Sequence, residues 1–98
     1  MAAGARSHAE GYYTQTIGEN SHAEGCYTTT NNTAEHACGA YNFSNKDITL
    51  FSIGCGNEGI NGSPIVRQNA IEVDNNGNVY IMGIGGYNGQ NISDSSSV

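Results

Sequence analysis

Histidine recurs three times in the first half of the chain at a spacing of fourteen residues, as His8, His22 and His36. Glu10 and Glu24 each follow a histidine by two residues, so in an extended strand each glutamate lies on the same face as its histidine. Imidazole and carboxylate groups can bind a divalent metal ion or hydrogen-bond to one another. We favour a structural interpretation, in which these five residues form histidine–glutamate hydrogen bonds at a subunit interface. A metal site on the three histidines is the alternative.

These residues belong to a short internal repeat. The segment SHAEG at residues 7–11 returns unchanged at residues 21–25 and in altered form, EHACG, at residues 35–39. A fixed short period is typical of a stacked repeat in which neighbouring units stabilise one another. Within each unit small and large residues alternate, which predicts two short strands per coil with the small side chains lining a narrow interior. The sequence therefore predicts an all-β protein, a parallel β-roll (solenoid) of about three 14-residue coils.

Three segments follow from this pattern. Residues 1–46 are expected to form the β-roll, and residues 47–87 a β-strand and hairpin segment that holds the subunits together. In that second segment we expect an apolar strand over residues 47–54, and then a hairpin whose turn is DNNG at residues 74–77. Residues 88–98 are rich in asparagine and serine and are predicted to be a flexible linker or tail.

The composition favours an oligomer. Hydrophobic residues make up 37% of the 98 residues, and the interior of the predicted roll is filled by small side chains that contribute little transfer free energy. A monomer would also leave the apolar strand and one face of the hairpin exposed to water. Small scaffolds of this kind usually need cross-links or oligomerisation. We therefore expect an obligate oligomer.

Charge and cysteine content exclude several classes of function. The net charge is −6 with only three basic side chains, so we expect no nucleic-acid binding. No apolar run is long enough to cross a bilayer, and small and polar residues follow Met1 directly, so we expect neither membrane insertion nor a secretory signal. The cysteines lack CxxC spacing and are expected to be free thiols of a protein assembled in a reducing cytoplasm, at positions Cys26, Cys38 and Cys55.

Two motifs resemble ligand sites without meeting their requirements. Residues 54–59 spell GxGxxG, but the following residues cannot form the helix that a dinucleotide site needs. Asp74, Asn76 and Asn78 match the start of a calcium loop, yet the loop's final glutamate is missing, so a hairpin turn is favoured. The repeat itself brings serine and cysteine residues near the histidines, so their proximity does not indicate a catalytic group. We expect no enzyme activity and no cofactor.

Tyr13, Tyr27 and Tyr41 also recur at the coil period, which places them on the large-residue face of the second strand of each coil. Their rings could pack between neighbouring coils or chains. An exposed row of tyrosines could instead bind glycan, because ring faces suit the C–H surface of a sugar and hydroxyls pair with its oxygens. We favour packing over glycan binding.

Residues 4–45, with their SHAEG units, resemble the head repeats of trimeric autotransporter adhesins and the related repeats of phage tail fibres. The SHAEG form is more similar to the phage-type repeats, because the adhesin heads usually carry valine or isoleucine where this chain has His8 and Glu10. Residues 48–87 are similar to the β-rich segment that follows such repeats in phage and prophage fibres. The resemblance implies a left-handed β-roll, with three chains packed in parallel as a homotrimer.

The same resemblance implies a function. It indicates a structural shaft or receptor-binding module of a phage or prophage tail fibre, located in the virion after cytoplasmic assembly. The partners would be further copies of this chain and a glycan or protein of the host surface. One alternative is a head fragment of a trimeric adhesin on a bacterial cell surface. The other is a metal-binding or purely structural trimeric scaffold fragment.

Overall fold

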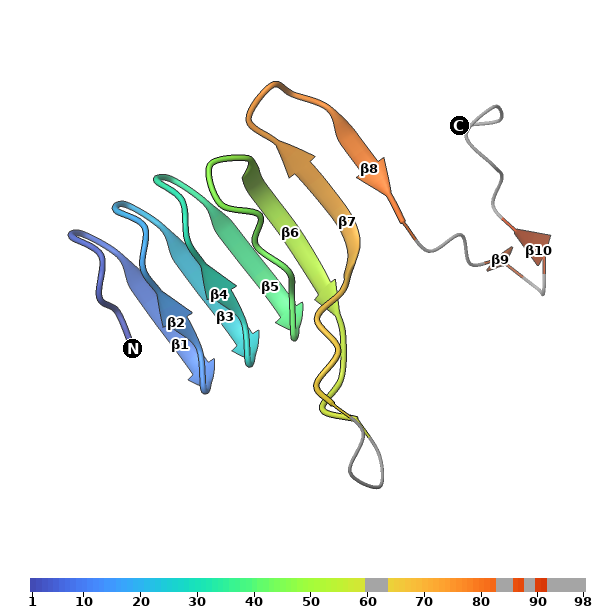
Figure 1. Cartoon of the computed structure of the whole chain (residues 1–98), viewed down its shortest axis with the longest axis horizontal. Coiled ribbons are helices and arrows are strands. Elements are labelled where there is room, and N and C mark those ends of the chain that lie inside the picture. The colour runs from blue at the N-terminus through green and yellow to red at the C-terminus, as the bar shows by residue number, and fades with distance from the viewer. Residues whose placement is uncertain (60–63, 83–85, 88–89, 92–98) are drawn as a thin grey trace.

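The computed structural model describes residues 1–59, 64–82, 86–87 and 90–91, and every regular element in these ranges is a β-strand (Figure 1). In those ranges no helix is long and apolar enough to cross a membrane. The predicted all-β class is confirmed. The strands in chain order are β1 (His8–Tyr12), β2 (Gln15–Thr16), β3 (His22–Cys26), β4 (Thr29–Thr30), β5 (His36–Ala40), β6 (Thr49–Cys55), β7 (Asn69–Asp74), β8 (Val79–Ile81), β9 (Gly86–Tyr87) and β10 (Gln90–Asn91).

The repeat builds a stack of parallel strands. A six-stranded sheet has the order β1-β3-β5-β6-β7-β8, while β2 and β4 form a second small sheet beside it (Figure 1). In β1, β3 and β5 equivalent residues of successive coils lie opposite one another, so His8 pairs with His22 and His22 with His36. Because consecutive units have equal length, each turn of the chain returns to the same register. The predicted β-solenoid is confirmed.

Small side chains fill the space between the two layers, as predicted. Ala23 and Ala37 on the large sheet are fully buried, and so are Thr16 and Thr30 on the small one. The buried hydroxyl groups are satisfied across the interior, since Ser21 Oγ lies 2.9 Å from Thr30 Oγ1. Among the described residues no buried hydroxyl group lacks a hydrogen-bond partner, so these polar side chains do not destabilise the roll.

Tyr13, Tyr27 and Tyr41 do not lie in a strand, and the prediction that placed them on the second strand of each coil was wrong. Tyr13, Tyr27 and Tyr41 have φ values of 53°, 56° and 49°, and they form the corner between the long and the short strand of each coil. Two residues separate the long strand from the short strand of the same coil, so the chain must turn sharply between them. The left-handed conformation supplies that turn at an energetic cost for a residue with a Cβ.

The parallel stack continues one strand further than the recognisable repeat. β6 pairs in parallel with β5, with His36 opposite Phe51 and Gly39 opposite Gly54. The offset between these partners is fifteen residues, one more than in the preceding coils, and the sequence of β6 (TLFSIGC) has lost the histidine. The six-stranded sheet therefore runs without a break past residue 46, where the roll was expected to end.

The small sheet ends differently, because asparagine side chains take the place of further strands. The N–H of Thr29 donates to Asn42 Oδ1 over 2.7 Å, and Asn42 Nδ2 donates to the carbonyl oxygen of Thr29 over 2.9 Å. Asn69 bonds to Phe43 in the same way, over 2.8 and 2.7 Å. Both asparagines are buried. Each side-chain amide thus satisfies the two backbone groups that a neighbouring strand would otherwise have met.

The predicted hairpin is confirmed. β7 and β8 pair antiparallel, with Ile71 opposite Ile81 and Val73 opposite Val79, and β7 also pairs antiparallel with β6. Asp74 closes the turn, since its Oδ1 accepts from the backbone N–H of both Asn76 and Asn78. β9 and β10 form a separate antiparallel pair. Apart from residues 90–91, the predicted tail at 88–98 lies outside the described residues.

Candidate histidine–glutamate site and tyrosine row

The strand register gathers the three histidines into one row on the outer face of the large sheet, which we call the histidine row (His8, His22 and His36). The ring centroids of His8 and His22 lie 4.7 Å apart, and so do those of His22 and His36. The interplanar angle is 27° for the first pair and 7° for the second. The row continues onto Phe51 in β6, whose ring lies 5.5 Å from that of His36. Sequence reasoning missed Phe51 because it lies beyond the recognisable repeat.

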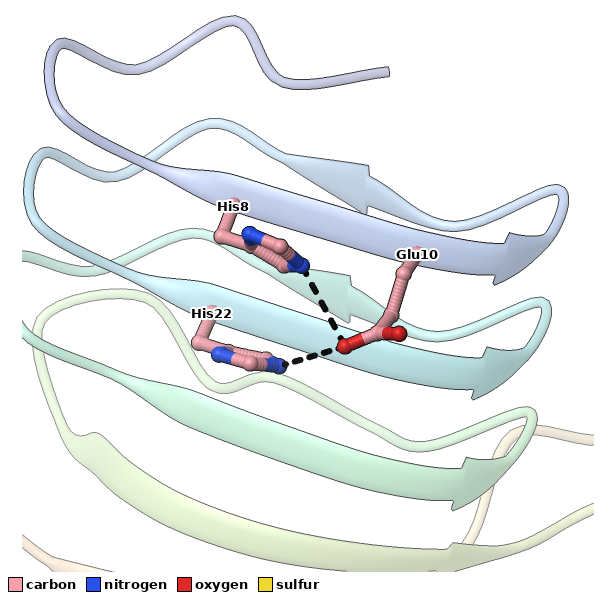
Figure 2. A group of neighbouring side chains, drawn as sticks. All are labelled: His8, Glu10 and His22. Atoms are coloured by element: carbon pink, nitrogen blue, oxygen red, sulfur yellow. Dashed lines mark hydrogen bonds and ion pairs between the residues drawn. The ribbon is translucent and has the colours of Figure 1, made fainter.

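The glutamates lie between the histidines and link successive coils. Glu10 Oε1 lies 3.2 Å from His8 Nε2 and 3.6 Å from His22 Nε2, so both rings point toward one carboxylate oxygen (Figure 2). Glu24 Oε1 repeats this arrangement one coil further on, 3.6 Å from His22 Nε2 and 3.2 Å from His36 Nε2. The structure therefore brings all five predicted residues together within a single chain, where the sequence analysis expected contacts between chains.

Burial differs along the row. The side chain of His8 is 61% exposed, whereas that of His22 is 35% exposed. The Nε2 atom of His22 is buried and has no hydrogen-bond partner among the described residues, because both neighbouring carboxylates lie 3.6 Å away. A buried ring nitrogen without a partner is uncommon, because buried polar groups are normally hydrogen-bonded.

The third coil replaces the glutamate by Cys38, which ends the alternation of histidine and carboxylate. The Cys38 side chain is partly buried, and burial raises the pKa of its thiol. Glu24 nearby adds to this effect. A thiol with a raised pKa is a weak nucleophile. The structure records Cys26, Cys38 and Cys55 as free cysteines.

Glu35 is a buried carboxyl group that the sequence analysis did not single out. It replaces the serine found at this position in the first two coils, and its Oε1 accepts from the N–H of Asn31, the N–H of Asn32 and the hydroxyl of Ser44. Burial raises the pKa of Glu35 despite these bonds. Its Oε1 satisfies backbone amides where the small sheet has ended, whereas its Oε2 is buried with no hydrogen-bond partner among the described residues. An acidic residue at a serine position of the repeat was the available signal.

The corner tyrosines form a second row, the tyrosine row (Tyr13, Tyr27 and Tyr41). The centroids of Tyr13 and Tyr27 lie 4.9 Å apart, and those of Tyr27 and Tyr41 lie 4.6 Å apart with planes only 6° from parallel. Tyr13 is 65% exposed whereas Tyr41 is 7% exposed. The row therefore packs between coils, as the favoured interpretation predicted, and is open to solvent mainly at its N-terminal end.

Arg67 covers the buried end of the tyrosine row, a contact that no pattern in the sequence predicts. Its guanidinium carbon lies 5.8 Å from the ring centroid of Tyr41, within cation–π range. Its Nη1 donates to the carbonyl oxygens of Tyr27 and Asn42 over 2.7 and 3.1 Å. A shallow groove of about 440 Å³ lies beside the row, and its lining includes Tyr27, Tyr41, Cys26 and Glu58. Desolvation by burial raises the pKa of Tyr41.

Comparison of the chain with protein families, curated proteins and solved structures gave no match. The repeat and the geometry of the two rows are the features of the molecule that bear on its function.

Proposed function

We propose that this chain is a shaft segment of a homotrimeric fibre of the phage or prophage tail-fibre kind. The observation that carries the proposal is the register of the stack, in which residues 8–12, 22–26 and 36–40 lie directly over one another and residues 51–55 extend the series. Each added coil lengthens such a stack by one strand spacing without changing its cross-section. Lengthening by repetition is the property that a rigid shaft requires.

Exposed apolar side chains between residues 50 and 82 support the homotrimer. Val79 is 63% exposed, and Leu50, Ile65, Ile81 and Met82 are exposed as well. These residues lie in the segment 47–87, which we expect to hold the subunits together. Burial of such side chains between copies of the chain would supply the apolar area that the small-residue interior does not.

The oligomeric state tests this proposal. We expect multi-angle light scattering to give the mass of three chains at micromolar concentration, and we expect no folded monomer on dilution. A matched pair of variants examines the interface: Val79→Asp should weaken the trimer, whereas Lys46→Asp, at an exposed site within the roll, should leave it intact. A folded and stable monomer of the parent chain would exclude the shaft model.

A receptor-binding module is the second candidate, and the exposure of Tyr12 and Tyr13 favours it. These two rings lie at the solvent-exposed end of the tyrosine row with their centroids 4.6 Å apart, at nearly a right angle. Adjacent exposed rings of this kind can hold a sugar face, and a trimer would gain affinity from three weak sites. On a glycan array, Tyr13→Ala should abolish any signal while light scattering still reports the intact oligomer. The alternative of a bacterial surface adhesin would use the same surface.

A further inference from the structure

We infer that His8, Glu10 and His22 form a binding site for one divalent transition-metal ion, with Zn²⁺ as the representative ion. The inference is independent of the fibre proposal. The donor atoms of the three residues all lie within 4.8 Å of one another, and they come from two successive coils, β1 and β3 (Figure 2). Two imidazole nitrogens and a carboxylate oxygen are a donor set that suits Zn²⁺ and leaves a fourth position for water.

The two distances from the Glu10 carboxylate are compatible with a shared metal ion. Ligand atoms 2.0–2.1 Å from a tetrahedral zinc ion are about 3.3 Å from one another. Glu10 Oε1 lies 3.2 Å from one ring nitrogen and 3.6 Å from the other, on either side of that value. In the metal-free protein the same oxygen is hydrogen-bonded to His8 Nε2, and the ion would take the place of that bond.

The Nε2 atom of His22 is the second observation that points to a ligand. It is buried, it has no hydrogen-bond partner among the described residues, and it is directed toward the Glu10 carboxylate (Figure 2). A bound cation would satisfy this nitrogen and would balance the carboxylate charge beside it. Neither neighbouring glutamate does so by itself, because each is 3.6 Å away.

The orientation of the histidine rings favours a metal site between the first and second coils over one between the second and third. The lone pair of an imidazole nitrogen lies in the plane of its ring, so two strictly parallel stacked rings cannot both aim at an ion between them. The planes of His8 and His22 are 27° apart, whereas those of His22 and His36 differ by 7°. His8 also has an exposed side chain that can turn toward the ion. The group of His22, Glu24 and His36 shares His22, so the two groups cannot both be filled through its Nε2.

The ion would stabilise the first coil, at the N-terminal end of the roll. β1 is an edge strand of the six-stranded sheet, and β3 is its only partner among the described strands. Coordination by His8 and Glu10 on β1 together with His22 on β3 would cross-link these two strands through their side chains. Occupation of the site should therefore protect the first coil in particular.

Zinc binding to the whole chain tests the inference. We expect isothermal titration of the EDTA-treated, dialysed protein with ZnCl₂ to give one ion per chain with a micromolar dissociation constant. Amide hydrogen exchange in residues 8–12 should slow when Zn²⁺ is added. His8→Gln and Glu10→Gln should each weaken binding at least about tenfold. The matched controls His36→Gln and Glu19→Gln should bind as the parent does.

Four results would overturn the inference. The first is no uptake by the parent below about 1 mM Zn²⁺. The second is unchanged binding in His8→Gln, whose exposed position leaves folding intact, as circular dichroism would verify. The third is a loss caused by His36→Gln and not by His8→Gln, which would assign the ion to the second group. The fourth is one ion per three chains, which would place the ion between subunits.

Discussion

The side-chain amide of Asn42 is hydrogen-bonded to both backbone groups of Thr29, over 2.7 Å to the N–H and 2.9 Å to the carbonyl oxygen. In the first two coils the residue at this position is threonine, Thr14 and Thr28, and there a backbone strand meets the neighbouring coil. Asn42 thus replaces a strand by a side chain at the point where the small sheet stops.

Asn42→Thr would restore the repeat and still destabilise the protein. The N–H and C=O of Thr29 would lose their partners, and unsatisfied buried groups cost about 1–3 kcal/mol. Urea unfolding followed by circular dichroism should show a loss of that size. An unfolding free energy equal to that of the parent would mean that water replaces the amide without cost.

Gly25→Ala should disrupt the stack of strands. Gly25 has φ 109°, and a Cβ there would overlap the carbonyl oxygen of Gly39 in the next coil. Backbone strain and overpacking together should cost more than about 3 kcal/mol. Gly77→Ala is the matched control, since Gly77 has φ 87° but no atom within 4 Å of the added Cβ, and only strain of about 1 kcal/mol is expected. Equal thermal midpoints for the two variants would contradict this account.

The Asp74 turn should make stability depend on pH in acid. Hydrogen bonds from the side chain and backbone of Asn78 lower the pKa of Asp74 from 3.8 to about 2. A carboxyl group with a depressed pKa stabilises the fold above its unfolded-state value, and this stabilisation is lost as the pH falls through the folded-state value. The contribution is therefore complete above about pH 4 and disappears toward pH 2.

Asp74→Asn isolates this contribution. The variant should be less stable than the parent at pH 7, and the difference between the two should shrink as the pH falls from 4 to 2. Asp47→Asn serves as the control, because the Asp47 side chain is 83% exposed. Thermal melts across this pH range measure the effect, and a difference that stays constant with pH would refute it.

The tyrosine row should contribute unequally along its length. Tyr41 is buried under Arg67, so Tyr41→Ala should cost about 3 kcal/mol or more, in the range of large aromatic truncations. Tyr13 has the same backbone conformation but an exposed ring, so Tyr13→Ala should cost less than about 1 kcal/mol. Similar losses in chemical denaturation would show that Tyr13 is covered in solution, as it would be at a subunit contact.

Periodicity made the roll predictable, and breaks in periodicity limited the prediction. Equal spacing of the SHAEG units was sufficient to place His8, His22 and His36 in one row and to place the alanines inside. A strand over residues 47–54 was predicted, but its parallel pairing with β5 was not, because β6 follows after one extra residue and carries Phe51 in place of histidine. A one-residue insertion hides a repeat in sequence, yet β6 still pairs in unbroken parallel register with β5 after it.

The sequence by itself determined the period, the small-residue interior and the hairpin turn, because each depends on residues a few positions apart or on equal spacing along the chain. Only the tertiary structure decided that the tyrosines turn corners, that each glutamate oxygen lies between two histidines of the same chain, and that Asn42 and Asn69 end the small sheet. Each of these features depends on which group lies in the adjacent coil. Units inside a repeat have the same sequence pattern and adopt the same structure. The structure at its ends and corners depends instead on which groups the adjacent coil presents.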